Sequence, residues 1–208
     1  MTTPLAKKHR PGRPDRTARR RPGRPRREDV DAAILDATID ELEEHGYGAV
    51  NIEAVAARAG VAKTTVYRRW PSKDELVFDA ISKLKGPIPQ VPGRGLREDL
   101  MYLMERIRRS WVNSRHGRIM RQLSAEGTRN PELYQAFRDR LVAPRQAVMF
   151  AVLRKGVEDG EIRADVDLQW VIDLLVAPVM VAVLTHRPHV SRAQLAFTID
   201  TILRGIAP

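Results

Sequence analysis

The sequence contains no cysteine, and this absence excludes several kinds of protein at once. Without thiols there can be no disulfide framework, no cysteine nucleophile and no cysteine-ligated zinc site. The glycine-framed serine of hydrolases, the phosphate-binding loop of nucleotide hydrolases and the paired histidines of zinc proteases are also missing. His186 and His189 lie three residues apart without a nearby carboxylate, which is too little for a metal site. We therefore expect no catalytic residue, no metal and no cofactor, and we predict that the protein is not an enzyme.

Long apolar runs are scarce as well. The N-terminal residues hold no apolar run, so we expect no signal peptide. Residues 170–184 are almost entirely apolar, but with Asp173 and Pro178 among them they fall short of the about 20 residues that span a membrane. We predict no membrane association, and the lack of cysteine fits a reducing cytoplasm. A helix that is apolar all round is predicted to be buried on all sides.

Positive charge is concentrated at the start of the chain. The formal net charge is +10 over 208 residues. Residues 1–27 hold eleven lysines and arginines against a single acid, Asp15, whereas residues 28–208 carry 25 bases and 25 acids. Because this segment also has few apolar side chains, it cannot bury enough surface to fold alone, and we predict a disordered basic tail.

The tail contains two copies of the sequence Arg-Pro-Gly-Arg-Pro, at residues 10–14 and 21–25. Each resembles the Gly-Arg-Pro centre of an AT-hook, in which an arginine enters a narrow minor groove over A·T tracts. The arginines in that position are Arg13 and Arg24, although a proline stands before each glycine where an AT-hook has arginine. The tail therefore has two interpretations: minor-groove insertion, or a polybasic arm that adds sequence-independent affinity for DNA.

Residues 51–70 predict two short helices joined by a tight turn. The first has apolar residues at helical spacing, with Asn51 as a candidate N-cap. Gly60 follows it, at a position where a left-handed backbone is needed. The second helix is expected over residues 63–70 and is stopped by Pro71. Two such helices form a helix-turn-helix, whose second helix enters the DNA major groove.

The second of these helices is rich in hydrogen-bond donors. Six positions carry them: Lys63, Thr64, Thr65, Tyr67, Arg68 and Arg69. Val66 and Trp70 lie one turn apart and can face inward. Hydroxyls and cations reach phosphates and base edges, so this composition predicts DNA contact. The alternative is a solvated basic helix in an all-α domain.

The run from residue 56 to residue 76, Ala-Ala-Arg-Ala-Gly-Val-Ala-Lys-Thr-Thr-Val-Tyr-Arg-Arg-Trp-Pro-Ser-Lys-Asp-Glu-Leu, resembles the signature of the TetR family of bacterial transcriptional regulators. The match covers about residues 30–76. The resemblance implies an N-terminal DNA-binding domain, a C-terminal ligand-binding and dimerisation domain, and repression that a small-molecule effector relieves. At Ala62 the family usually has serine, so a side-chain N-cap that is typically worth ~1 kcal/mol is missing.

The candidate DNA contacts follow from the motif and the resemblance together. They are Asn51, Ala62, Lys63, Thr64, Thr65, Tyr67, Arg68 and Lys73, with Arg13 and Arg24 from the tail. We assign base or nearby phosphate contacts to Lys63, Thr64, Thr65 and Arg68, and phosphate contacts to Tyr67 and Lys73. Lys73 lies at the start of a further helix, because Ser72 and Glu75 have the spacing of a capping box.

The chain divides into four segments. They are the basic tail at 1–27, a helix-turn-helix domain at 28–84, a proline- and glycine-rich linker at 85–95 and a ligand-binding and dimerisation domain at 96–208. Within the last segment, Asn130 and Pro131 predict a helix start, and Pro144 predicts a kink. We predict an all-α fold, with a three-helix DNA-binding domain before a larger helical domain.

The effector pocket is expected among large side chains of the C-terminal domain. The candidates are Met104, Trp111, Leu123, Phe137, Phe150, Trp170 and Asp173. For each apolar residue the alternative is ordinary core, and Asp173 could instead pair with an arginine across an interface. The resemblance implies a homodimer formed by the last two helices, which suits a palindromic double-stranded operator with half-sites ~34 Å apart. A rival interpretation is an architectural DNA-binding protein that acts through its tail without an effector.

Overall fold

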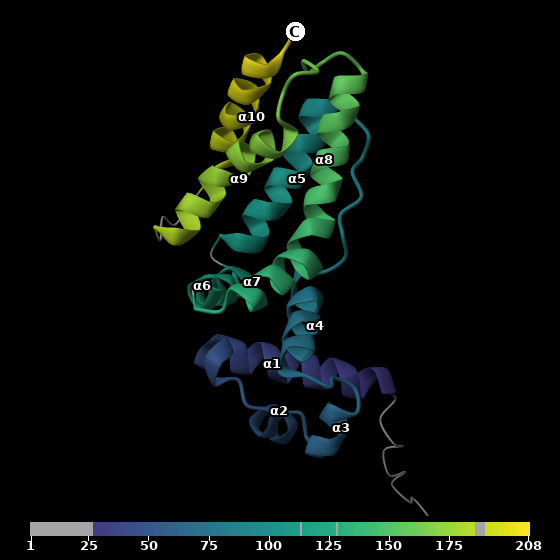
Figure 1. Ribbon diagram of the computed structural model, residues 1–208, viewed down its shortest axis with the longest axis vertical. Helices are drawn as coiled ribbons and strands as arrows, with labels where there is room; N and C mark the ends of the chain where they lie inside the picture. The colour runs from purple at the N-terminus through teal and green to yellow at the C-terminus, as the bar shows by residue number, and fades with distance from the viewer. Residues whose placement is uncertain (1–26, 113, 128, 186–189) are drawn as a thin grey trace, which may run out of the picture.

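The computed structural model describes residues 27–112, 114–127, 129–185 and 190–208. These residues form ten α-helices and one π-helical turn and contain no strand, which confirms the predicted all-α class. Figure 1 shows a small head of α1 to α3 at one end, an elongated body of α5 to α10 at the other, and α4 standing between them. Residues 1–26 of the basic tail, with Arg13 and Arg24, lie outside the described residues, as do His186 and His189.

The head is built from short helices with local stop and start signals. Its elements are α1 (Arg27–Ala49), α2 (Ile52–Arg58) and α3 (Lys63–Tyr67), followed by α4 (Lys73–Lys85). The backbone leaves helical geometry at Gly46 within α1, where φ is 75°. Asn51 caps α2 by accepting a hydrogen bond from the Glu53 amide at 2.7 Å, and Gly60 has a φ of 67° in the turn. Both predictions are confirmed.

The third helix is shorter than predicted. It ends at Tyr67 rather than near Trp70. The amides of Arg69 and Trp70 both donate to the Val66 carbonyl oxygen at 2.9 Å, so the last turn tightens instead of continuing as α-helix. Val66 and Trp70 are buried in the head core, as their spacing predicted. The Trp70 indole N–H also donates to Asp79 on α4 at 2.9 Å.

The body begins after residues 86–95, which contain no helix. Its elements are α5 (Leu96–Trp111), α6 (Arg115–Gly127), α7 (Pro131–Phe137), η1 (Arg138–Val142), α8 (Ala143–Glu158), α9 (Leu168–Leu184) and α10 (Arg192–Ile206). Asn130 caps α7 by accepting a hydrogen bond from the Leu133 amide at 3.1 Å. None of the described helices is both long enough and apolar enough to cross a bilayer.

The helix around Pro144 is interrupted by a π-helical turn. The single kinked helix expected around Pro144 is instead two α-helices, α7 and α8, joined by the π-helical turn η1. Pro144 lies in the first turn of α8, where its missing N–H and fixed φ cost least. The wider π turn before it absorbs the change in hydrogen bonding.

Head and body meet through packed side chains. One buried cluster joins the head to α6, α7 and η1, and a second joins α5 to α8, α9 and α10; Trp111 packs against both. The buried ring of His116 meets the Trp111 ring edge-on, with 5.2 Å between centroids. Its Nδ1 lies 3.0 Å from the Ser110 carbonyl oxygen and 3.1 Å from the Ser110 hydroxyl.

Burial makes His116 a source of acid sensitivity. Desolvation, with a further contribution from the charge of Lys85, lowers the pKa of His116 from 6.5 to about 3. Between these values the unfolded chain binds one more proton than the folded chain, so the free energy of unfolding falls as the pH falls. From pH 7.5 to pH 5 this loss should reach about 2 kcal/mol.

Urea unfolding of the wild type and of His116→Gln across this pH range measures the effect. We expect the variant to lose less stability on acidification than the wild type. His45→Gln is the control, because the His45 side chain is 52% exposed. Equal pH slopes for the wild type and His116→Gln would contradict the assignment.

Candidate nucleic-acid interface and body cavity

The outer surface of the head presents the side chains of α3. Lys63, Thr64, Tyr67 and Arg68 are exposed, and Thr65 is half-buried. In Figure 1, α2 and α3 lie at the end of the head that is remote from the body. Because Val66 points inward, the helix turns its donors outward while one apolar side chain anchors it to the core. Such an arrangement leaves the polar face available to a groove of DNA.

The cations of α3 and of the turn that follows it are not equivalent. Lys63 forms an ion pair with Glu53 on α2, and its Nζ lies 5.5 Å from the centre of the Tyr67 ring. Arg69 forms an ion pair with Asp31 on α1 and donates to the Thr65 carbonyl oxygen at 3.2 Å, so it braces the head.

Arg68 forms no ion pair within the part of the chain that the structure describes. Among Lys63, Arg68 and Arg69, Arg68 therefore meets the least competition for a phosphate or a base edge.

Lys73 is held against the head. Its Nζ donates to the Tyr47 carbonyl oxygen at 3.2 Å and lies 4.4 Å from the centre of the Tyr47 ring. The Tyr47 hydroxyl donates to Asp74, and burial together with this bond raises the pKa of Tyr47. Ser72 accepts a hydrogen bond from the Glu75 amide at 3.2 Å, which is one half of the predicted capping box. The phosphate contact assigned to Lys73 stays a prediction.

Two predicted contact residues lie at the starts of the motif helices. Asn51 uses its side-chain oxygen to cap α2, and Ala62 stands at the N-cap of α3 without a side-chain hydrogen bond. Their assigned contacts to DNA stay predictions. The backbone at Ala62 is extended, with φ −71° and ψ 143°, which is the conformation that a capping side chain needs.

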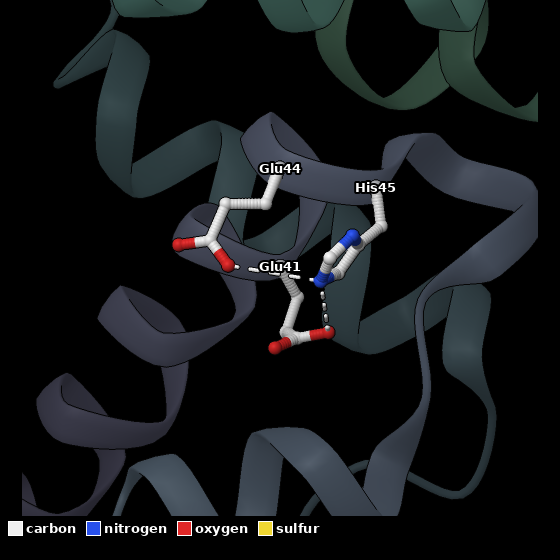
Figure 2. Close-up of side chains that lie close together, drawn as sticks. All are labelled: Glu41, Glu44 and His45. Carbon is white, nitrogen blue, oxygen red and sulfur yellow. Dashed lines mark ion pairs between the residues drawn. The ribbon is translucent and has the colours of Figure 1, made fainter.

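Three potential metal ligands lie together at the end of α1. Figure 2 shows the Nε2 of His45 facing the carboxylates of Glu41 and Glu44, at 4.0 Å and 3.6 Å from their oxygens. Arg58 on α2 donates to both Glu44 oxygens at 2.6 Å and 2.8 Å and lies 3.2 Å from Glu41. The hydrogen bond from Arg58 lowers the pKa of Glu44. An arginine therefore already pairs with both carboxylates, and the group ties α1 to α2.

A cavity of about 500 Å³ opens in the body. Its walls come from the end of α4, the following linker, α5, α6, α7, η1, α8 and α9. Most of the lining is apolar, including Leu103, Ile107, Met149, Ile172, Val176 and Met180. Of the residues proposed from sequence for a pocket, Trp111 and Phe137 line it. A volume of this size suits a drug-sized organic molecule.

The other pocket candidates lie elsewhere. Met104 and Leu123 are buried in the two core clusters and do not line the cavity. Phe150 and Trp170 are exposed, and so is Asp173, which accepts a hydrogen bond from Gln169 at 3.1 Å. None of these five residues lines the cavity, although Phe150 lines a second, more open pocket, and the ligand contacts assigned to them stay predictions.

The position of Trp170 outside the cavity has a geometric reason. In α9 the cavity side follows helical spacing through Ile172, Val176, Met180 and Val183. Trp170 and Leu174 fall on the opposite side, and they are exposed. The prediction that this helix is buried on all sides is also wrong for the single chain. Since the stretch is apolar all round, its sequence gave no sign of which side meets the cavity.

The cavity also holds residues that sequence reasoning missed. Five cations line it: Lys85, Arg106, Arg121, Arg138 and Arg145. The Lys85 Nζ and the Arg145 Nη1 both donate to the Leu141 carbonyl oxygen, at 3.3 Å and 3.2 Å. Burial, and then the charge of Arg145, lowers the pKa of Lys85 to about 8. Burial, and then the charge of Arg106, lowers the pKa of Arg145. These cations sit on five different elements, so no sequence spacing marks them as a group.

A short polar helix displayed by a three-helix head defines a helix-turn-helix DNA-binding protein. Comparison with known proteins gives the family. The model described as bacterial regulatory proteins of the tetR family matches residues 34–80, and the one described as a tetracyclin repressor-like C-terminal domain matches residues 93–202. The chain belongs to the TetR family of bacterial transcriptional regulators, and the recognition made from the motif is confirmed.

Relatives and solved structures agree with this assignment. The HTH-type transcriptional regulator Rv1556 of Mycobacterium tuberculosis strain H37Rv is 34% identical, over 83% of this chain and 86% of its own. The DNA-binding transcriptional repressor TetR of Mycobacteroides abscessus is 32% identical, over 75% of this chain and 80% of its own. The crystal structure of the TetR family regulator SCO0332 is 30% identical, covers 86% of this chain and 100% of that chain, and has a TM-score of 0.65.

The empty N-cap of α3 can be filled by substitution. Ala62→Ser supplies a side-chain oxygen to an amide of the first turn and should raise the free energy of unfolding by ~1 kcal/mol. The matched control is Ala57→Ser, at an exposed position within α2, where serine has no cap to form and should lower stability slightly. Urea unfolding of the two variants gives the comparison. A fall in stability for Ala62→Ser would show that α3 does not begin at residue 63.

Proposed function

We propose that the chain is a repressor that binds a palindromic operator as a homodimer and leaves it when a small molecule enters the body cavity. The observation that carries the proposal is α3, which buries Val66 and presents polar donors to solvent. The name of the 32% identical relative, a DNA-binding transcriptional repressor, supports repression. A regulator acts on the chromosome, so we expect it in the bacterial cytoplasm.

The contacts with DNA divide into two kinds. Thr64, Thr65 and Arg68 reach base edges or adjacent phosphates from α3, and Lys63 joins them once DNA replaces Glu53 as its partner. The remaining contacts position the head on the backbone. They are Tyr67 and Lys73 through their side chains, and Asn51 and Ala62 at the helix starts. Arg13 and Arg24 of the tail would add charge beside the operator.

A second copy of the chain is the proposed partner of the body. Six large apolar side chains on α8, α9 and α10 are between 40% and 69% exposed: Phe150, Trp170, Leu174, Val181, Leu184 and Phe197. Apolar surface of this extent on neighbouring helices marks an interaction site. A twofold arrangement would bring two α3 helices to half-sites one helical turn, ~34 Å, apart.

The cavity and the head share one helix. At its start α4 packs on α1 in the head core, and at its end Lys85 lines the cavity. A ligand in the cavity therefore contacts the helix on which the head rests. This contact gives an effector a physical means to change the position of the head, which a protein acting only through its basic tail would lack. The same arrangement favours a ligand-controlled regulator over an enzyme.

The division between base and phosphate contacts can be tested on the operator found by footprinting DNA that flanks this gene. Lys73→Ala should weaken binding to all sequences alike and lower the salt slope by about one. Thr65→Ala should change base preference instead. The control is Lys83→Ala, at the far end of α4, where the lysine pairs with Asp36 at 2.7 Å. A change of preference in Lys73→Ala together with unchanged preference in Thr65→Ala would reverse the assignment.

The dimer can be tested by placing a charge on the exposed apolar face. Phe197→Glu, at a side chain that is 69% exposed, should shift the protein toward the monomer in sedimentation velocity and weaken operator binding. Ile88→Glu is the control, because Ile88 is 48% exposed but lies in the linker between α4 and α5. A sedimentation coefficient of the wild-type complex that corresponds to one protein chain per operator would refute the dimer.

A further inference from the structure

The charge of the body cavity has one sign. Among the residues that line it are five cations and no acid. The uncharged polar groups of the lining are the side chains of Ser110 and Gln146, the Tyr134 hydroxyl and the Trp111 indole N–H, and the remainder is apolar. Cavity walls in proteins usually hold few polar groups, so the composition of those few indicates what the cavity binds.

These cations also lack carboxylate partners. Within the described ranges none of the five forms an ion pair, whereas Arg108 and Arg109, on the same helix as Arg106, both pair with Glu105 at 2.7 Å and 3.0 Å. Lys85 and Arg145 instead share a single carbonyl oxygen, that of Leu141. Arg145 also donates to the Gly86 carbonyl oxygen at 2.6 Å. Carbonyl groups satisfy hydrogen bonds but do not neutralise charge.

Like charges held close together in a partly buried wall repel one another. Burial is the main cause of the lowered pKa values of Lys85 and Arg145, and a neighbouring cation adds to each: Arg145 to the shift of Lys85, and Arg106 to that of Arg145. With a pKa of about 8, Lys85 remains charged in most molecules at pH 7. A negative group placed between these side chains would be attracted to all of them and would relieve the repulsion.

We propose that the cavity binds an amphipathic organic anion, with a carboxylate or phosphate held by Lys85, Arg106 and Arg145 and an apolar body along α9. The proposal rests on the proposed function only in treating this anion as the effector. A cationic ligand would meet like charge. A neutral ligand would fill the volume but leave the cations without a counter-charge.

The apolar part of the ligand has a defined wall. All the lining residues of α9 are apolar, and its central ones are Ile172, Val176, Met180 and Val183. Met149 on α8 extends this surface with an adaptable side chain. The five cations come from α4, α5, α6, η1 and α8, so the charged and apolar sides of the cavity are built by different elements.

Four probes with one alkyl chain separate charge from hydrophobicity. Dodecanoate, dodecyl phosphate, dodecanol and dodecylammonium are titrated below their micellar concentrations into the full chain, and binding is measured by calorimetry. We expect dodecanoate or dodecyl phosphate to bind about tenfold or more tightly than dodecanol, and dodecylammonium to bind most weakly. The stronger of the two anions identifies the head group. Dodecanol or dodecylammonium binding as tightly as both anions, or no binding of either anion, would overturn the proposal.

Variants then assign the anion to the cavity. Arg106→Gln and Arg145→Gln should each weaken binding of the better anion about tenfold and leave dodecanol unchanged. Each has a control on the same helix outside the cavity lining: Arg109→Gln on α5, 72% exposed, and Arg154→Gln on α8, 65% exposed. Arg145→Lys keeps the charge and should keep most of the affinity, which separates loss of charge from loss of fold. Equal losses in the controls would overturn the site.

Operator release is measured separately from binding. An anion that binds through Arg106 and Arg145 without displacing the operator would refute the effector role and leave the anion site intact. If a neutral compound released the operator, and substitution of Arg106 or Arg145 did not change that release, the repressor function would stand and the proposal of an anionic effector would be refuted. The two failures are therefore distinguishable.

Discussion

The DNA-facing helix depends on the burial of two side chains. A helix of five residues without a side-chain N-cap is not stable alone, because nucleation costs more than so few hydrogen bonds return. Val66 and Trp70 supply the missing stability by packing into the head core. The Trp70 indole fixes the end of the motif to Asp79 on α4. Recognition by α3 is thus a property of the packed head rather than of its own sequence.

Asp79 also connects the head to the cavity wall. Its second carboxylate oxygen accepts a hydrogen bond from Arg140 of η1 at 3.0 Å. The same π turn carries Arg138 and Val142 in the cavity lining and presents the Leu141 carbonyl oxygen to Lys85 and Arg145. Two hydrogen bonds to Asp79, one from Trp70 and one from Arg140, therefore connect the recognition motif to the π turn at the proposed ligand site. Pro144, by forcing a break in the helix, places this unusual turn where those contacts meet.

The features of the head could be predicted from sequence because they depend on interactions between neighbouring residues. The Asn51 cap, the left-handed Gly60 and the inward spacing of Val66 and Trp70 depend on neighbours within a few positions, and the structure has all of them. Features that depend on distant residues could not be found in the same way. Lys85 and Arg145 are sixty positions apart in the chain, yet they bind one carbonyl oxygen. The half-formed capping box at Ser72 shows that spacing alone does not decide where a long side chain goes.

Helix α9 shows why composition and single-chain burial disagree. Its sequence is apolar on every side, and a helix of that kind is stable only where every side is covered. Within one chain, Ile172 and Val176 meet the cavity and core while Trp170 and Leu174 remain exposed to water. In the proposed dimer the outer side would be covered by the second copy, and the composition would then fit its surroundings. The same helix would then lie between the ligand and the partner subunit. A ligand that moved α9 would change the separation of the two heads as well as the position of one.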